Sequence, residues 1–207
     1  MKLLLYSSYK LAPDHLDALM DLTGKAPQDI TFAVISNAVD VYEQSDWVQE
    51  SVAALTVRGS QVQPVDLRKW KGNPHGLRDI LAASDVIWVC GGHTYYLRWL
   101  MRETGADDVI TELVRAGKVY AGWSAGACIA GPTLKYLEPF DDPKDAPEMI
   151  YEGLGLTDAV ILPHVDMDDF AEGMERANQK LQREGYHTVP LREDQALLVD
   201  GDTQTLI

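Results

Sequence analysis

The sequence has few cysteines and few basic residues, and each shortage excludes a class of protein. Only two cysteines, Cys90 and Cys128, occur in 207 residues. Neither belongs to a Cys-x-x-Cys or Cys/His pattern, so we expect neither a disulfide scaffold nor a bound metal. Lysine and arginine number 18 against 32 acidic residues, a formal charge of −14. A chain this acidic is repelled by nucleic acid and by anionic membrane surfaces, so neither is an expected partner.

Long apolar runs are also missing. No stretch reaches the ~18 apolar residues that a membrane-spanning helix needs, and no small-residue cleavage site follows the short apolar start. We therefore expect a cytoplasmic protein without a membrane segment. Apolar residues make up 46% of the chain and charged residues 24%, as in ordinary globular proteins. The length predicts a single domain over residues 1–207.

Short apolar segments alternate with helical patterns along most of the chain. The early strands are expected at 2–7, 30–35, 61–65, 85–90 and 119–122, with helical periodicity between most of them. Most of these strands are apolar on both faces, which is typical of a parallel sheet covered by helices on each side. The later elements expected are a surface loop at 138–152, a strand at 159–162, a helix at 169–183 and short strands at 188–191, 195–199 and 203–206.

The most specific local signal is a G-W-S-A-G segment at 122–126, where the strand at 119–122 ends. Such a segment between a strand and a helix is typical of a nucleophile elbow, whose glycines leave room for a sharp turn. The hydroxyl of Ser124 is then exposed at the apex, and the N–H of Ala125 is a candidate donor to an oxyanion. The other interpretation is an ordinary strand-to-helix turn with serine as the N-cap.

Paired glycines follow the preceding strand of the predicted sheet. Gly92 is the second of them, and glycine lets backbone N–H groups approach a ligand closely. If the two strands are neighbours, Gly92 supplies a second oxyanion donor beside Ser124. His93 is then a candidate to contact substrate. The alternative is an ordinary turn with Thr94 as the N-cap of the next helix.

A nucleophilic serine needs a base, and the base needs an acid that orients it. His164 directly follows the apolar strand at 159–162, so we expect it at the same sheet edge as Ser124 and predict it to be the base. The alternative is a hydrogen-bonded structural histidine. The acid has no such local signal. Its candidates are Glu138, Asp141, Asp142 and Asp166.

Taken together, these segments resemble a known family. The residues G-G-H-T at 91–94, A-G-W-S-A-G-A at 121–127, G-P-T at 131–133, G-L-G-L at 153–156 and P-H at 163–164 are similar to the peptidase E (aspartyl dipeptidase) and cyanophycinase family of serine peptidases. The resemblance implies a flavodoxin-like three-layer α/β/α sandwich with a mainly parallel sheet, related to class I glutamine amidotransferase domains. It also implies a Ser-His-acid mechanism that uses no metal and no cofactor.

The resemblance assigns roles to individual residues. It implies Ser124 as nucleophile, His164 as general base, and the backbone N–H groups of Gly92 and Ala125 as the oxyanion hole. Three features differ from the family pattern. His93 replaces the usual asparagine, and Pro139 aligns with the acidic residue of the dipeptidases. The neighbouring Glu138 is therefore the predicted acid, because its extra methylene lets it reach the imidazole from a displaced backbone. The segment V-D-M-D-D-F at 165–170 replaces the Gly-Glu-Thr-Arg-type stretch that follows the histidine in the dipeptidases, so a strict preference for an N-terminal aspartate is not implied.

The predicted function is a serine peptidase that hydrolyses short peptides. Two alternatives come from other classes: a non-catalytic, amidotransferase-like binding domain that keeps the elbow as architecture, and an esterase. The sequence favours the peptidase because glycines flank Ser124 on both sides and His164 is well placed at a strand end. The peptide specificity stays open, as does the choice between a monomer and a homodimer.

Overall fold

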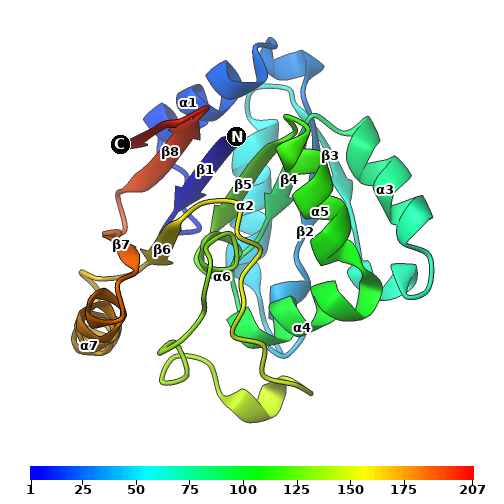
Figure 1. Ribbon diagram of the computed structural model, residues 1–207. Coiled ribbons are helices and arrows are strands. Elements are labelled where there is room, and N and C mark those ends of the chain that lie inside the picture. The colour runs from blue at the N-terminus through cyan, green and yellow to red at the C-terminus, as the bar shows by residue number, and fades with distance from the viewer.

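A computed structural model describes residues 1–207, apart from the side chain of residue 143, and contains a seven-stranded sheet with helices on both faces (Figure 1). The strand order is β3-β2-β4-β5-β1-β8-β9. The first five strands in that order are parallel, whereas β8 is antiparallel to β1 and β9 is antiparallel to β8. The strands are β1 (Lys2–Tyr6), β2 (Thr31–Ile35), β3 (Gln61–Pro64), β4 (Val86–Val89), β5 (Val119–Trp123), β8 (Ala196–Asp200) and β9 (Thr203–Leu206). The predicted α/β class with a mainly parallel sheet is confirmed.

Side chains of each central strand alternate between two cores, one on each face of the sheet. In β1, Leu3 and Leu5 belong to the larger core and Leu4 to the smaller one. Period-two alternation places successive side chains on opposite faces, so burial of all three shows that both faces are covered. The smaller core is covered by α1 (Pro13–Thr23) and α2 (Asp46–Thr56), and the larger by α3 (Pro74–Ala83), α4 (Thr94–Thr104) and α5 (Ala106–Arg115). No described helix is both long and apolar enough to cross a bilayer.

A second, smaller sheet carries part of the site. Strand β6 (Ala159–Leu162) pairs in parallel with β7 (His187–Pro190), and α7 (Asp168–Arg183) connects them. The sequence predicted both strands but not that they form a sheet of their own. Beyond the pair, the Val165 N–H donates to the Leu191 carbonyl at 3.2 Å. This contact brings the chain after β6 beside the chain after β7.

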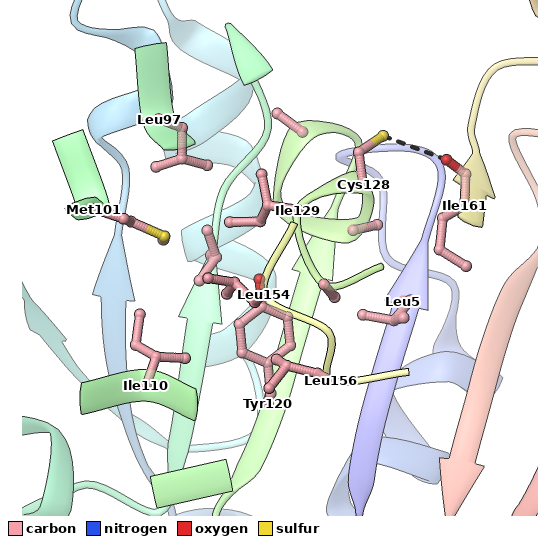
Figure 2. Close-up of a cluster of buried hydrophobic side chains, with 14 of the residues drawn as sticks. Leu5, Leu97, Met101, Ile110, Tyr120, Cys128, Ile129, Leu154, Leu156 and Ile161 are labelled. Carbon is pink, nitrogen blue, oxygen red and sulfur yellow. Dashed lines mark hydrogen bonds between the residues drawn. The ribbon is translucent and has the colours of Figure 1, made fainter. Parts of the chain in front are cut away.

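The loop at 150–156 packs against the elbow and the larger core (Figure 2). Leu154 belongs to the same core as Tyr120 and Ile129, and its N–H donates to the Ile129 carbonyl at 2.7 Å. The Cys128 thiol reaches the Ile161 carbonyl of β6 at 3.6 Å. These contacts join the elbow, the loop at 150–156 and the small sheet into one packed unit.

The segment at 138–152, predicted as a surface loop, is irregular but not wholly at the surface. Its side chains Asp141, Ala146 and Ile150 are buried. Phe140 and Asp141 of this segment line the cavity described below, so the segment forms part of the cavity wall. The short 3-10 turns of the chain are η1 (Pro27–Asp29), η2 (Asn37–Val39), η3 (Leu67–Trp70) and η4 (Pro143–Asp145).

The turn after β5 depends on close backbone approaches that only glycine permits. A Cβ added at Gly122 collides with the carbonyl of Gly126, and one added at Gly126 collides with the carbonyl of Val89. We expect Gly126→Ala to lower the free energy of unfolding by about 1–3 kcal/mol, because the backbone has to shift to admit the methyl group. Urea unfolding measures this change, and an unaltered midpoint with an unaltered slope contradicts the expectation.

Candidate active site

Ser124 stands at the apex of a sharp turn between β5 and the short helix α6 (Ala125–Cys128). Its backbone has φ 48° and ψ −116°, a strained conformation for a residue with a side chain. Its N–H donates to the Tyr6 carbonyl of β1 at 3.1 Å, and its carbonyl accepts the N–H groups of Ala127 and Cys128, each at 2.9 Å. The strand, turn and helix expected of an elbow are all present, and they hold the hydroxyl outward.

His164 reaches this hydroxyl from the small sheet. Its Nε2 lies 2.9 Å from Ser124 Oγ. The histidine follows Pro163 with a positive φ of 61°, and its N–H donates to Ser7 Oγ at 2.7 Å. The ring packs against Phe170, with centroids 5.0 Å apart. Backbone and ring are thus both held, so the imidazole keeps its orientation toward Ser124.

The carboxylate beside His164 belongs to Glu193, in the loop between β7 and β8. Glu193 Oε1 lies 2.5 Å from His164 Nδ1 and accepts the Ser7 hydroxyl at 2.9 Å. Asp166 Oδ1 accepts the Glu193 N–H at 2.9 Å, which fixes the loop. A carboxylate only accepts hydrogen bonds, so Nδ1 of the imidazole carries the proton and Nε2 is left to accept one from Ser124.

The hydrogen bonds around Glu193 also fix its charge. Partial burial acts to raise the pKa of Glu193, but hydrogen bonds from His164 and then Ser7 outweigh it and hold that pKa below its usual value. The group is therefore a carboxylate throughout the neutral range, as an imidazole-orienting acid has to be.

The sequence-based choice of Glu138 as the acid is corrected by this geometry. Glu193 occupies the position at His164 Nδ1, whereas Glu138 lies beside Tyr151, where burial and then this carboxylate raise the pKa of the tyrosine hydroxyl. Of the other candidates, Asp166 supports the Glu193 loop and Asp142 caps the turn η4. Asp141 lines the cavity that contains Ser124.

His93, which we expected from the sequence to contact substrate, instead bonds to other parts of the chain. The residue is buried and forms the N-cap of α4, where its Nδ1 accepts the Tyr96 N–H at 3.1 Å. Its Nε2 lies 2.9 Å from the Asp142 carbonyl and donates to it. Both ring nitrogens are thus used within the chain. His93 fixes the loop at 138–142 over the sheet edge, and Thr94, the other candidate cap, is the first residue of the helix.

Gly92 lies where a second oxyanion donor is expected. Strands β4 and β5 are neighbours, with Val89 opposite Gly122, so the turns after them meet at one sheet edge. Gly92 has φ 139°, and a Cβ there would lie 2.5 Å from the Ala38 carbonyl. It lines the same cavity as Ser124, and Ala125 directly follows the serine. Both residues therefore stay the predicted donors.

A hydrogen-bonded carboxylate supports the segment behind Gly92. Asp66 Oδ1 accepts from the side chain of Asn37, which lies next to Ala38, at 3.1 Å. The Arg68 side chain, with further help from Asn37, lowers the pKa of Asp66 to about 2. Because the folded-state pKa is depressed, this carboxylate stabilises the fold above its unfolded pKa of about 3.8, and the contribution is lost as the pH falls through about 2.

We expect Asp66→Asn to lower the free energy of unfolding by about 1 kcal/mol at pH 6, since solvent screens a partly exposed pair. The difference between variant and wild type shrinks as the pH falls below about 4, because Asp66 of the unfolded chain then becomes protonated while the native carboxylate stays ionised until the pH approaches about 2. Urea unfolding at pH 6 and pH 3 measures both differences. A pH-independent difference contradicts the role assigned to this charge.

A cavity of about 120 Å³ opens in front of Ser124 and His164. Its walls are mainly apolar and aromatic, and its polar side chains include those of Thr94 and Asp141. The part of the chain that the structure describes holds no group of three or more His, Cys, Asp or Glu side chains arranged to bind a metal ion. The arrangement provides a nucleophile, a base and an orienting acid next to a partly open cavity.

Comparisons with known proteins identify a family and several relatives that this chain resembles. The model of peptidase family S51 matches residues 3–207. An uncharacterized peptidase of Pasteurella multocida is 31% identical over 209 residues, covering 99% of this chain and 96% of its own length. Peptidase E of Haemophilus influenzae is 35% identical over 116 residues, which cover 56% of this chain and 48% of that protein.

Solved structures show the same architecture. A crystal structure of a Listeria monocytogenes protein assigned to peptidase E has a TM-score of 0.85 and 30% identity, and the match covers 100% of this chain and 97% of that chain. A peptidase from an acI-B1 Actinobacterium has a TM-score of 0.69 at 19% identity, covering 100% of this chain and 86% of that one, and supports the fold alone.

Proposed function

Because the chain belongs to peptidase family S51 and is a serine peptidase, we propose that it hydrolyses short peptides through an acyl-enzyme on Ser124. The family resemblance read from the motifs is thereby confirmed. The mechanism and the substrate length are the parts that we add. They rest on the contacts around Ser124 and on the shape of the cavity.

The proposed first half-reaction uses three side chains. His164 Nε2 takes the Ser124 proton as the oxygen attacks the peptide carbonyl, and Glu193 stabilises the imidazolium that forms. The N–H groups of Gly92 and Ala125 hydrogen-bond the oxyanion. His164 then gives its proton to the departing amine, and the C–N bond breaks to leave an ester on Ser124.

The second half-reaction uses the same groups with water as nucleophile. His164 takes a proton from water, the hydroxide attacks the ester carbonyl, and Ser124 leaves with the proton that His164 returns. The products are a free carboxylate and the restored serine. Each proton transfer runs between Nε2 and an oxygen or nitrogen at the reacting carbon, so one orientation of the imidazole serves both halves.

One observation supports this mechanism most directly: Ser124 Oγ, His164 and Glu193 form a continuous hydrogen-bonded series at 2.9 and 2.5 Å. A binding domain that kept the elbow only as architecture has no need of a histidine with an oriented lone pair facing a strained serine. The small cavity, partly covered by the loop at 138–152, supports short substrates rather than segments of folded proteins.

A fluorophosphonate probe and a dipeptide library test the proposal together. We expect the probe to label the wild type, and to label neither Ser124→Ala nor His164→Ala at a comparable rate. We expect some dipeptides to be cleaved with higher kcat/KM than longer peptides or simple esters. Failure of the wild type to react with the probe supports the binding-domain alternative, and ester turnover without peptide turnover supports the esterase.

A further inference from the structure

We propose that Asp141 binds the α-amino group of the substrate, so that the enzyme selects peptides with a free amino terminus and a first side chain that is not acidic. This inference rests on the proposed function, because it names the substrate class of the same cavity. It gives Asp141, whose side chain the mechanism above does not use, a role in binding rather than in proton transfer.

Asp141 is a buried carboxylate in the wall of the catalytic cavity. Its exposed fraction is 7%, and it lines the same cavity as Ser124 and His164. A buried carboxylate is costly unless it is paired or fully hydrogen-bonded. Burial raises the pKa of Asp141, although the contacts from Thr94 and the nearby His93 partly oppose that shift. A bound ammonium group supplies the missing counter-charge.

The hydrogen bonding of Asp141 leaves room for such a partner. Its Oδ2 accepts the Thr94 N–H at 2.8 Å, which fixes the carboxylate at the start of α4. A carboxylate offers about four lone-pair positions, so further donors can still be accepted. The N-terminus of α4 is already capped by the side chain of His93, whose Nδ1 accepts the Tyr96 N–H. Capping alone therefore does not require an acid that faces the cavity.

The position of an α-amino group follows from the chemistry. In an N-terminal residue, the nitrogen is two bonds from the carbonyl carbon that Ser124 attacks, a distance of about 2.5 Å. A group that binds it must therefore line the cavity of the nucleophile. Gly92, the predicted oxyanion donor, is two residues before Thr94, which donates to Asp141. Backbone continuity thus places the carboxylate close to the reacting carbonyl.

The rest of the lining indicates what the first side chain can be. Among the described residues that line the cavity, none is lysine or arginine. Its apolar members include Leu137, Phe140 and Met174. The negative charge of Asp141 also acts on Tyr42, which lines the same cavity. Partial burial and then Asp141 raise the pKa of the Tyr42 hydroxyl to about 12. An acidic first side chain is repelled by Asp141 and meets no cation in the lining, so it is disfavoured.

Four substrates and two variants test the inference. The substrates are the p-nitroanilides of alanine, N-acetylalanine and aspartate, and the dipeptide Ala-Leu. Asp141→Asn keeps an oxygen that accepts the Thr94 N–H but removes the charge. Asp142→Asn is the matched control, because it removes a charge from the adjacent exposed side chain. Labelling of Ser124 by a fluorophosphonate reports on the catalytic machinery without an amino group.

We expect the wild type to prefer free alanine anilide over both its acetylated form and the aspartate anilide by at least about 10-fold in kcat/KM. Asp141→Asn is expected to lower kcat/KM for alanine anilide and for Ala-Leu by roughly 10- to 100-fold, mainly through KM, as expected for the loss of a charge-assisted hydrogen bond. The rate of probe labelling stays within about 3-fold in this variant. Asp142→Asn leaves every rate within about 3-fold of wild type.

Three results overturn the inference while leaving the proposed function intact. The first is a wild type that cleaves free and acetylated substrates equally well. The second is an Asp141→Asn variant that keeps the wild-type preference, and the third is an Asp141→Asn variant that loses probe labelling and turnover of all substrates to the same extent. By contrast, a wild type that neither reacts with the probe nor cleaves any peptide refutes the proposed function itself.

Discussion

Ser124→Ala is expected to lower kcat by about 10⁴-fold or more, because the hydroxyl that forms the acyl-enzyme is gone. The stability of the protein should hardly change. The substitution removes one hydroxyl from a cavity wall and leaves the backbone strain in place, so we expect the free energy of unfolding to stay within about 1 kcal/mol of wild type. Steady-state kinetics with the best dipeptide and urea unfolding of the same preparations measure the two effects.

Ser60→Ala serves as the control, because we expect it to lower stability without changing kcat. The Ser60 hydroxyl is buried and donates to the Pro27 carbonyl at 2.7 Å, next to the start of β3 and outside the catalytic cavity. Its loss should cost about 1 kcal/mol of stability and leave kcat unchanged. If Ser124→Ala keeps substantial turnover, the mechanism proposed here is refuted.

Glu193→Gln is expected to lower kcat by about 10²- to 10⁴-fold with little change in KM. The neutral amide can still bond to the imidazole but does not stabilise its protonated form, and it can also favour the wrong tautomer. Urea unfolding of the same preparation separates this effect from simple misfolding.

Glu138→Gln is the matched control, because it makes the same chemical change in the acid that the sequence favoured. We expect its kcat to stay within about 3-fold of wild type, since Glu138 lies beside Tyr151 and away from His164 Nδ1. If Glu138→Gln loses activity and Glu193→Gln does not, the acid assigned from the geometry is wrong.

The fold was largely predictable because short segments of the sequence, read one at a time, indicate its strands and turns. Strands that are apolar on both faces, such as 85–90, cannot be stable unless helices cover each side. The glycines of the elbow were equally informative, because any side chain at Gly122 or Gly126 collides with a neighbouring carbonyl unless the backbone shifts. Ser124 and His164 each directly follow a predicted strand, and they meet although the two strands belong to different sheets.

Glu193 was missed because its position depends on a distant strand pairing. The residue stands in a turn next to Asp194, where a carboxylate is usually only solvated. It reaches His164 because β8 pairs antiparallel with β1, with Ala196 opposite Tyr6. This register carries the start of β8 to the carboxyl end of β1. The available signal was a carboxylate just before a predicted strand, but its use required knowing that the strand is antiparallel.

His93 shows how proximity in sequence can mislead. The residue follows Gly92, so contact with substrate was a reasonable expectation. The imidazole is instead short enough to cap its own helix and long enough to reach the Asp142 carbonyl. Packing of the loop at 138–142 decides whether the His93 side chain points toward the cavity or toward that loop. No local pattern in the sequence specifies this packing.

Mass spectrometry of the quenched enzyme tests the central claim most directly. The enzyme is mixed with a p-nitrophenyl ester of alanine, quenched in acid within the first turnover, and digested for peptide mapping. We expect the peptide that contains Ser124 to gain the mass of one alanyl group, and the adduct to be absent from Ser124→Ala. Turnover with no adduct on Ser124, or with the acyl group on another residue such as Cys128, contradicts the account.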